Sequence, residues 1–118
     1  MEWPGRLETV REVEVETRAG ADAPAHRTTI WAVVDGGEVY IRSLRGPSGR
    51  WYREIMANPE AVLHLDGESI PVRGVHSPDE GSVARATAGF RRKYADSSAV
   101  NSMIRDEVAD TTVRLEPR

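Results

Sequence analysis

Alternating apolar and polar positions open the chain. Val13 and Val15 alternate with glutamates within residues 10–17, the period of two expected of a half-buried strand. Residues 28–34 form a β-branched and aromatic run that is apolar on both faces, as is a strand inside a barrel. Asp35-Gly36-Gly37 then favours a tight hairpin, and alternation resumes over residues 38–44. We expect three strands here, with the second and third paired.

Helical spacing replaces alternation after residue 46. Gly46-Pro47-Ser48-Gly49 ends the third strand, Ser48 is a candidate cap, and a short helix is predicted from Trp51 until Asn58-Pro59 ends it. Residues 60–65 and 68–76 flank Asp66-Gly67 and predict a second hairpin. Pro71 favours an edge or bulged position for the return strand.

The remaining residues predict two helices and a last strand. Ser77-Pro78-Asp79-Glu80 has the form of a capping box. The helix after it presents one face with four residues: Val83, Thr87, Phe90 and Tyr94. A second helix, capped by Ser97 or Ser98, runs to Ile104, and residues 112–116 alternate as a strand. The order β-β-β-α-β-β-α-α-β predicts a mainly β protein with peripheral helices, in which a small antiparallel barrel of six strands hides its edges.

Length and composition favour one domain over residues 1–118. The 118 residues are 39% hydrophobic and 30% charged, as in ordinary globular proteins. The chain has no cysteine, which excludes disulfides, thiolate metal sites and cysteine nucleophiles. No apolar run approaches the roughly 20 residues of a membrane helix, and residues 1–4 lack a charged-then-apolar leader. We therefore expect a cytoplasmic protein that does not contact a membrane.

Positive charge is concentrated in one segment, although the net charge is −3. The residues between Glu38 and Glu54 include no acid but four arginines: Arg42, Arg45, Arg50 and Arg53. They enclose a Gly/Ser-rich turn between a strand end and a helix start, where backbone N–H groups favour an anion. Arg45 and Arg50 can grip a phosphate and Ser43 or Ser48 can donate to it, with Trp51 beside a planar ring. The alternative is that these arginines are solvated and pair with glutamates while Trp51 fills the core.

Other candidate sites are weaker. The three histidines, His26, His64 and His76, are too scattered for a metal site, and we expect no metal. His64 lies mid-strand and can face a ligand. Trp31 and Tyr40, with nearby arginines, resemble a single-stranded nucleic-acid surface, but the acidic balance argues against nucleic acid. No Gly-x-Ser-x-Gly elbow, Walker loop or dinucleotide fingerprint is present, so no catalytic residue is identified.

The segments Ile30 to Ser43 and Gly49 to Arg53, with Ala57-Asn58-Pro59, resemble the split β-barrel flavoprotein superfamily. This superfamily includes pyridoxamine phosphate oxidase-like proteins and deazaflavin-dependent nitroreductases, and the chain resembles more closely a group of short actinobacterial-type proteins related to those reductases. The resemblance covers about residues 9–116, which we take as the core of the domain. It implies a six-stranded split barrel and a homodimer whose groove holds the cofactor, the deazaflavin coenzyme or FMN.

The resemblance also implies roles for single residues. Seven residues are expected to bind the cofactor: Ser43, Arg45, Arg50, Trp51, Thr28, Thr29 and Arg42. Trp31, Tyr40 and His64 are candidates for the substrate side. The implied activity is hydride transfer to a small organic acceptor. The alternative is a non-redox or cofactor-independent ligand-binding protein that reuses the groove.

Overall fold

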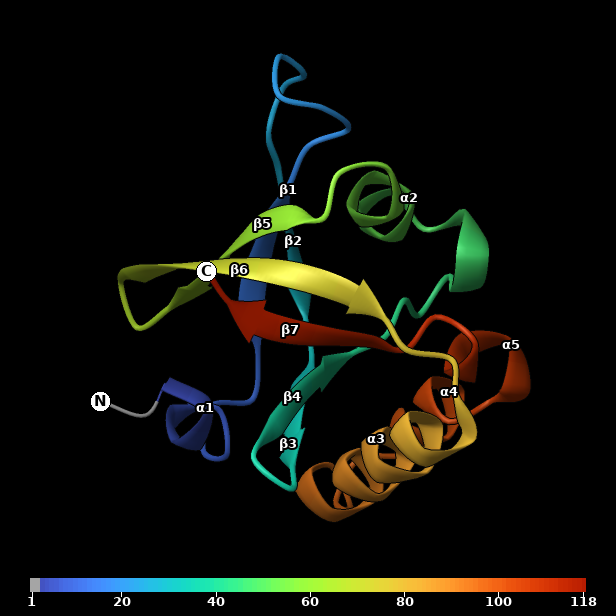
Figure 1. The fold of residues 1–118 in the computed structure, drawn as a ribbon. Coiled ribbons are helices and arrows are strands. Elements are labelled where there is room, and N and C mark those ends of the chain that lie inside the picture. The colour runs from blue at the N-terminus through green and yellow to red at the C-terminus, as the bar shows by residue number, and fades with distance from the viewer. Residues whose placement is uncertain (1–2) are drawn as a thin grey trace.

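The computed structural model describes residues 3–118 (Figure 1). Residues 1–2, part of the segment 1–4 in which the sequence predicts no leader, lie outside the described residues. The strands are β1 (Val13–Thr17), β2 (His26–Ile30), β3 (Ala32–Asp35), β4 (Glu38–Ile41), β5 (Glu60–Leu65), β6 (Glu68–His76) and β7 (Val113–Pro117). The helices are α1 (Trp3–Arg6), α2 (Arg50–Ala57), α3 (Glu80–Lys93), α4 (Val100–Met103) and α5 (Asp106–Ala109), with a 3-10 helix η1 (Gly46–Ser48) before α2. No helix within these residues is long and apolar enough to cross a bilayer.

The antiparallel sheet has seven strands, not the predicted six, in the order β2-β1-β5-β6-β7-β4-β3. The extra strand arises at Trp31, which divides the run predicted as one strand into β2 and β3. β2 pairs with β1 and β3 with β4, so two consecutive segments form opposite edges of the sheet. Since only Trp31 joins these edges, the sheet curls into a half-barrel, and the prediction of a mainly β protein with an antiparallel sheet is confirmed.

The predicted order also changes at both ends. α1 precedes the first strand, and the last helical segment is not one helix to Ile104 but α4 followed by α5. In Figure 1, α3, α4 and α5 gather on one side of the sheet, and α2 lies on another side near β5 and β6.

Both predicted hairpins are confirmed. Asp35 pairs with Glu38 across Gly36 and Gly37, whose φ angles of 62° and 81° suit a tight turn. The second hairpin joins β5 to β6 through Asp66 and Gly67, which also have positive φ. Local sequence therefore fixes these two registers.

Pro71 does not lie on an edge strand, because β6 runs between β5 and β7. The β6–β7 register starts at Val72 opposite Pro117, so Pro71 lies just beyond the paired part of β7. The Pro71 carbonyl accepts from the backbone N–H of Arg118, which places its N–H position on the same side. The N–H that proline lacks would point at Arg118, outside β7, so the register from Val72–Pro117 to His76–Val113 is unaffected and proline is tolerated in an interior strand.

α3 begins two residues later than its predicted capping box implies, which would have made Ser77 the N-cap. The N-cap is Asp79, whose carboxylate accepts from the backbone N–H of Ser82 at 3.0 Å. The buried face of α3 packs against β3, and Gly89 makes this approach possible: a Cβ there would lie 2.9 Å from Val33 Cγ2. The core therefore has two parts, the interior of the half-barrel and a second cluster beneath α3 that includes Tyr40, Phe90 and Tyr94.

Lys93, the only lysine in the chain, ties the end of α3 to the sheet. Its ammonium donates to the Ala32 carbonyl at 2.6 Å and to the Leu7 carbonyl. Burial, with help from the charge of Arg11, lowers the pKa of Lys93 from 10.5 to about 8.

The lowered pKa of Lys93 predicts a pH-dependent stability. Between about pH 8 and pH 10 the unfolded chain keeps a proton at Lys93 that the folded chain has released, so the free energy of unfolding rises with pH in this window. Urea denaturation at pH 7, 8, 9 and 10 should show this rise in the parent protein relative to Lys93→Met, which cannot titrate. Equal slopes for the two proteins would contradict the prediction.

Candidate functional site

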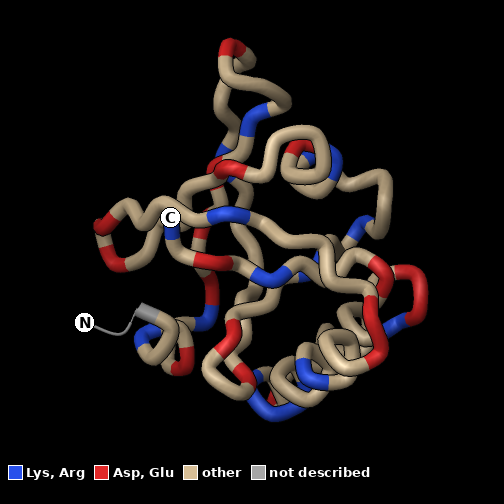
Figure 2. The backbone as a smooth tube through the Cα atoms, viewed as in Figure 1, with Lys and Arg blue, Asp and Glu red and all other residues tan. Residues whose placement is uncertain are grey.

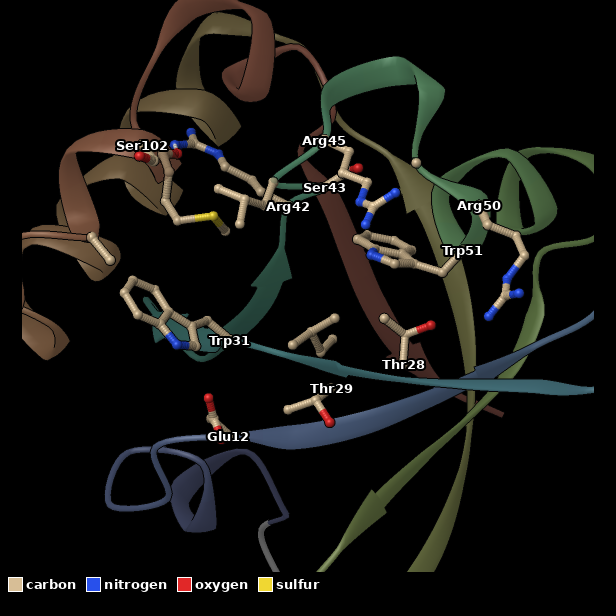
Figure 3. Close-up of a pocket in the computed structure, with 15 residues that line it drawn as sticks. Glu12, Thr28, Thr29, Trp31, Arg42, Ser43, Arg45, Arg50, Trp51 and Ser102 are labelled. Atoms are coloured by element: carbon tan, nitrogen blue, oxygen red, sulfur yellow. Dashed lines mark hydrogen bonds between the residues drawn. The ribbon is translucent and has the colours of Figure 1, made fainter.

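A cavity of about 610 Å³ opens where the β2–β3 junction meets the segment between β4 and α2 (Figure 3). Its volume lies within the range of about 300–1,000 Å³ typical of small-molecule sites. We call it the arginine pocket. It is lined by Glu12, Thr28, Thr29, Ile30, Trp31, Arg42, Ser43, Leu44, Arg45, Gly49, Arg50, Trp51, Ala99, Ser102 and Met103.

The loop between β4 and α2 shapes one wall of the pocket. Gly46, with a φ of 70°, donates its N–H to the Ser43 carbonyl at 2.9 Å and starts η1. Gly49 leaves room for Ser43, because a Cβ at Gly49 would lie only 2.2 Å from the Ser43 hydroxyl oxygen. Ser48 does not cap α2 as predicted: its hydroxyl donates to the Arg45 carbonyl, and Gly49 is the N-cap without a side-chain bond. The two glycines therefore bring Ser43 and the start of α2 to the same wall.

Three polar side chains at this wall have no partner among residues 3–118. Arg45 and Arg50 are exposed, and neither makes an ion pair or a side-chain hydrogen bond within residues 3–118. Ser43 is 1% exposed, and its hydroxyl likewise makes no hydrogen bond in the described chain. Every fully buried side-chain oxygen within residues 3–118 has a hydrogen-bond partner. The Ser43 hydroxyl oxygen has none, so it is accessible from the pocket. Between the end of β4 and α2, the charged residues over 41–53 are all arginines, which Figure 2 draws in blue. This end of the pocket can accept an anion.

Arg42 differs from the other arginines because it is only 1% exposed. Figure 3 shows its guanidinium directed away from Arg45 and Arg50. It donates to neutral acceptors on three segments: Thr112 Oγ1, the Met103 carbonyl, the Val83 carbonyl and Thr87 Oγ1, at 2.9–3.1 Å. No carboxylate faces it among residues 3–118, and burial lowers the pKa of Arg42 to about 10. Arg42 therefore supports the pocket wall from behind and adds positive potential to it.

Aromatic rings form two further walls. Trp31 stacks on Tyr94 with ring centroids 3.8 Å apart and an angle of 4° between the planes. Because Tyr94 covers one face of the indole, the half-buried Trp31 turns its other face toward the pocket. Trp51, at the start of α2, is 5% exposed and meets Tyr52 edge to face. The pocket thus combines a cationic end with flat apolar surfaces.

The structure brings together eight of the ten residues that the resemblance assigns to the cofactor or the substrate side. Thr28, Thr29, Trp31, Arg42, Ser43, Arg45, Arg50 and Trp51 all line the pocket. Tyr40 does not: it is fully buried beneath α3, where its hydroxyl accepts from Arg85 Nε at 3.0 Å. We leave Tyr40 out of the proposed site.

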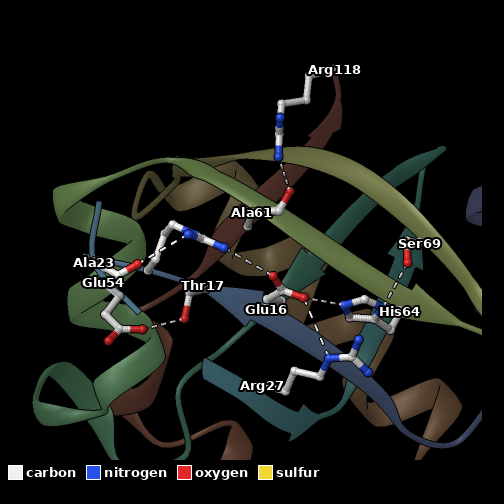
Figure 4. Close-up of polar contacts among 10 residues, drawn as sticks. Glu16, Thr17, Ala23, Arg27, Glu54, Ala61, His64, Ser69 and Arg118 are labelled. Atoms are coloured by element: carbon white, nitrogen blue, oxygen red, sulfur yellow. Dashed lines mark hydrogen bonds and ion pairs between the residues drawn. The ribbon is translucent and has the colours of Figure 1, made fainter. Parts of the chain in front are cut away.

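His64 also lies away from the pocket, on the outer face of β5 (Figure 4). Its Nε2 lies 2.8 Å from a Glu16 oxygen and its Nδ1 lies 3.2 Å from the Ser69 hydroxyl. The hydrogen bond with His64 is the main reason that the pKa of Glu16 is lowered. His64 therefore links neighbouring strands β1, β5 and β6, and we leave it out of the proposed site too.

Sequence reasoning missed the pocket residues from distant segments. Glu12 precedes β1, and Ser102 and Met103 come from α4. Glu12 looked like one of several strand glutamates and Met103 like an apolar position of a short helix. The hydrogen bond from Arg42 to the Met103 carbonyl joins α4 to the end of β4, and only the tertiary fold brings Glu12, Ser102 and Met103 to one cavity.

The curled sheet and its flanking pocket define a split β-barrel protein. Residues 5–115 match the family described as "Uncharacterized protein conserved in bacteria (DUF2255)", and the chain belongs to this family. No curated protein matches the chain in sequence.

Solved structures share the fold at low sequence identity. HutZ, described as the heme storage protein from Vibrio cholerae, has a TM-score of 0.70 and 11% identity over 97% of this chain and 86% of its own. A structure described as an F420 reductase has a TM-score of 0.56 and 19% identity over 98% and 93% of the two chains. A structure described as a domain-swapped dimer has a TM-score of 0.62 and 12% identity over 90% and 79%. At these identities the likeness concerns the fold.

Proposed function

We propose that the arginine pocket binds FMN or the deazaflavin coenzyme, and that the protein is a reductase acting on a small organic acceptor. The observation that carries this proposal is the set of unpartnered donors at one end of the pocket, Arg45, Arg50 and the Ser43 hydroxyl. Two guanidinium forks and a hydroxyl suit the oxygens of a phosphate, which accept several hydrogen bonds at once.

The rest of the pocket suits a flat ring system. Trp31 and Trp51 offer aromatic walls to it. Within the part of the chain that the structure describes, β2 is an edge strand that pairs with β1 alone, so its other side has backbone N–H and C=O groups that can bond to the polar edge of a ring. Thr28 and Thr29 lie on this strand and line the pocket. A bound flavin or deazaflavin supplies hydride transfer, and the protein supplies binding, orientation and charge.

Heme is the other cofactor to consider, because HutZ is described as a heme storage protein. Heme iron is held in proteins by His, Cys, Met or Tyr side chains. None of the residues lining the pocket is His, Cys or Tyr, and Met103 is the one sulfur donor, only 5% exposed. The lining therefore favours a phosphate-bearing ring over an iron porphyrin.

A homodimer follows naturally from the position of the pocket. It lies beside the edge strand β2, and Leu44 at its rim is 55% exposed. A second chain would cover this apolar side chain and close the pocket from solvent. Light scattering should give the mass of two chains, and the mass of one chain would contradict this part of the proposal.

Fluorescence titration tests the cofactor directly. At moderate salt, the parent protein should bind FMN or the deazaflavin coenzyme saturably and hemin more weakly. Arg50→Ala should weaken that binding at least about tenfold, the value of one charge-assisted hydrogen bond. Arg53→Ala is the matched control, because Arg53 also lies on α2 but donates to the Ser48 carbonyl and does not line the pocket. If neither coenzyme binds, the non-redox alternative is favoured.

A further inference from the structure

The end of the pocket remote from Arg50 is formed by Trp31 and Glu12 (Figure 3). Trp31 is held in place from behind. Tyr94 stacks on it, the Tyr94 hydroxyl donates to the Arg11 carbonyl at 2.6 Å, and the Arg11 guanidinium lies 5.0 Å from the Tyr94 ring centroid. Such a supported indole is a rigid surface for a ring to stack on.

Glu12 is the only acid among the residues that line the pocket. It is exposed, and within residues 3–118 it has no ion pair and no side-chain hydrogen bond. The neighbouring guanidinium of Arg11 is bound to Asp96 at 2.9 Å and so does not neutralise Glu12. The pocket is therefore dipolar, with two free cations at one end and one free carboxylate at the other.

A carboxylate accepts hydrogen bonds and repels anions. A ligand that places its anionic group at Arg45 and Arg50 must therefore present an N–H donor, not a second anion, to Glu12. The pyrimidinedione ring shared by flavins and deazaflavins carries such a group, the imide N3–H, at the edge of its ring system.

We propose that Glu12 is a specificity-determining residue that accepts a hydrogen bond from the imide N3–H of the ring stacked on Trp31. This inference rests on the proposed function of the pocket. It adds to that function an orientation of the bound ligand in the pocket, with the phosphate at Arg45 and Arg50 and the pyrimidinedione ring at Glu12.

The test compares FMN with N3-methyl-FMN, which has lost the donor but keeps the ring and the phosphate. The parent protein should bind FMN about tenfold or more tightly than N3-methyl-FMN. Glu12→Gln and Glu12→Ala should reduce or abolish this preference by weakening FMN binding. Arg50→Ala should weaken both ligands by the same factor and keep the preference.

Glu14→Ala is the control for removing a nearby acid, because Glu14 pairs with Arg27 and does not line the pocket. It should behave as the parent does. An unchanged preference in both Glu12 variants, with FMN binding and the Arg50 effect intact, would overturn the role of Glu12 alone. Failure of the parent protein to bind FMN or the deazaflavin coenzyme would overturn the proposed function and this inference together.

Discussion

Replacing Arg42 with alanine is expected to destabilise the fold by about 3 kcal/mol or more, the largest stability effect we predict from one substitution. The guanidinium joins β4 to α3, α4 and the segment before β7 through four hydrogen bonds. Truncation leaves buried carbonyl and hydroxyl oxygens without donors and opens a cavity beside Phe90, over which the guanidinium lies at 5.4 Å. Relief of a buried charge offsets only part of this loss.

Urea denaturation at neutral pH measures the effect. Arg91→Ala, at an exposed position of α3, is the control and should change stability by less than about 0.5 kcal/mol. Arg42→Lys should also lose much of the stability, because one ammonium cannot reach acceptors on three segments. A loss below about 1 kcal/mol for Arg42→Ala would show that the buried cation contributes little net stability.

Local signals account for the parts of the fold that the sequence predicts. The two hairpins depend on turn residues between alternating strands, and they form where predicted. The run of residues 28–34 has no glycine or proline that would predict the break at Trp31. Trp31 stacks on Tyr94, far along the chain, and the strands on either side of it pair with different neighbours, β2 with β1 and β3 with β4. The position of Pro71 depends in the same way on where β7 ends.

The residues of the candidate site likewise fall into two groups, those that local sequence identifies and those whose surroundings depend on tertiary packing. Ser43, Arg45 and Arg50 share one short loop, so composition alone singles them out. Residues 39–42 alternate between the two faces of the sheet. Val39 and Ile41 face the half-barrel interior, whereas Tyr40 and Arg42 face α3. Arg42 therefore has different surroundings from Arg45 and Arg50. Sequence could not show that α3 covers this second face. A solvated arginine and a buried one therefore looked alike.

Removing both pocket arginines is expected to have the largest effect on ligand binding. If Arg45 and Arg50 each make charge-assisted hydrogen bonds to the phosphate, the Arg45→Ala/Arg50→Ala variant should bind FMN roughly 10²- to 10⁴-fold more weakly. Riboflavin has the same ring system without the phosphate, so its affinity should hardly change. Fluorescence titration of both ligands measures the two effects separately.

The ratio of the two affinities makes the experiment decisive. The parent protein should prefer FMN to riboflavin strongly, and the double variant should bind the two almost equally. Arg53→Ala should keep the parent's preference, because Arg53 lies outside the pocket lining. An equal loss of FMN and riboflavin would mean that the arginines shape the pocket and do not hold the phosphate. The anion site would then have to lie elsewhere, since Arg42 already donates to four acceptors within the protein.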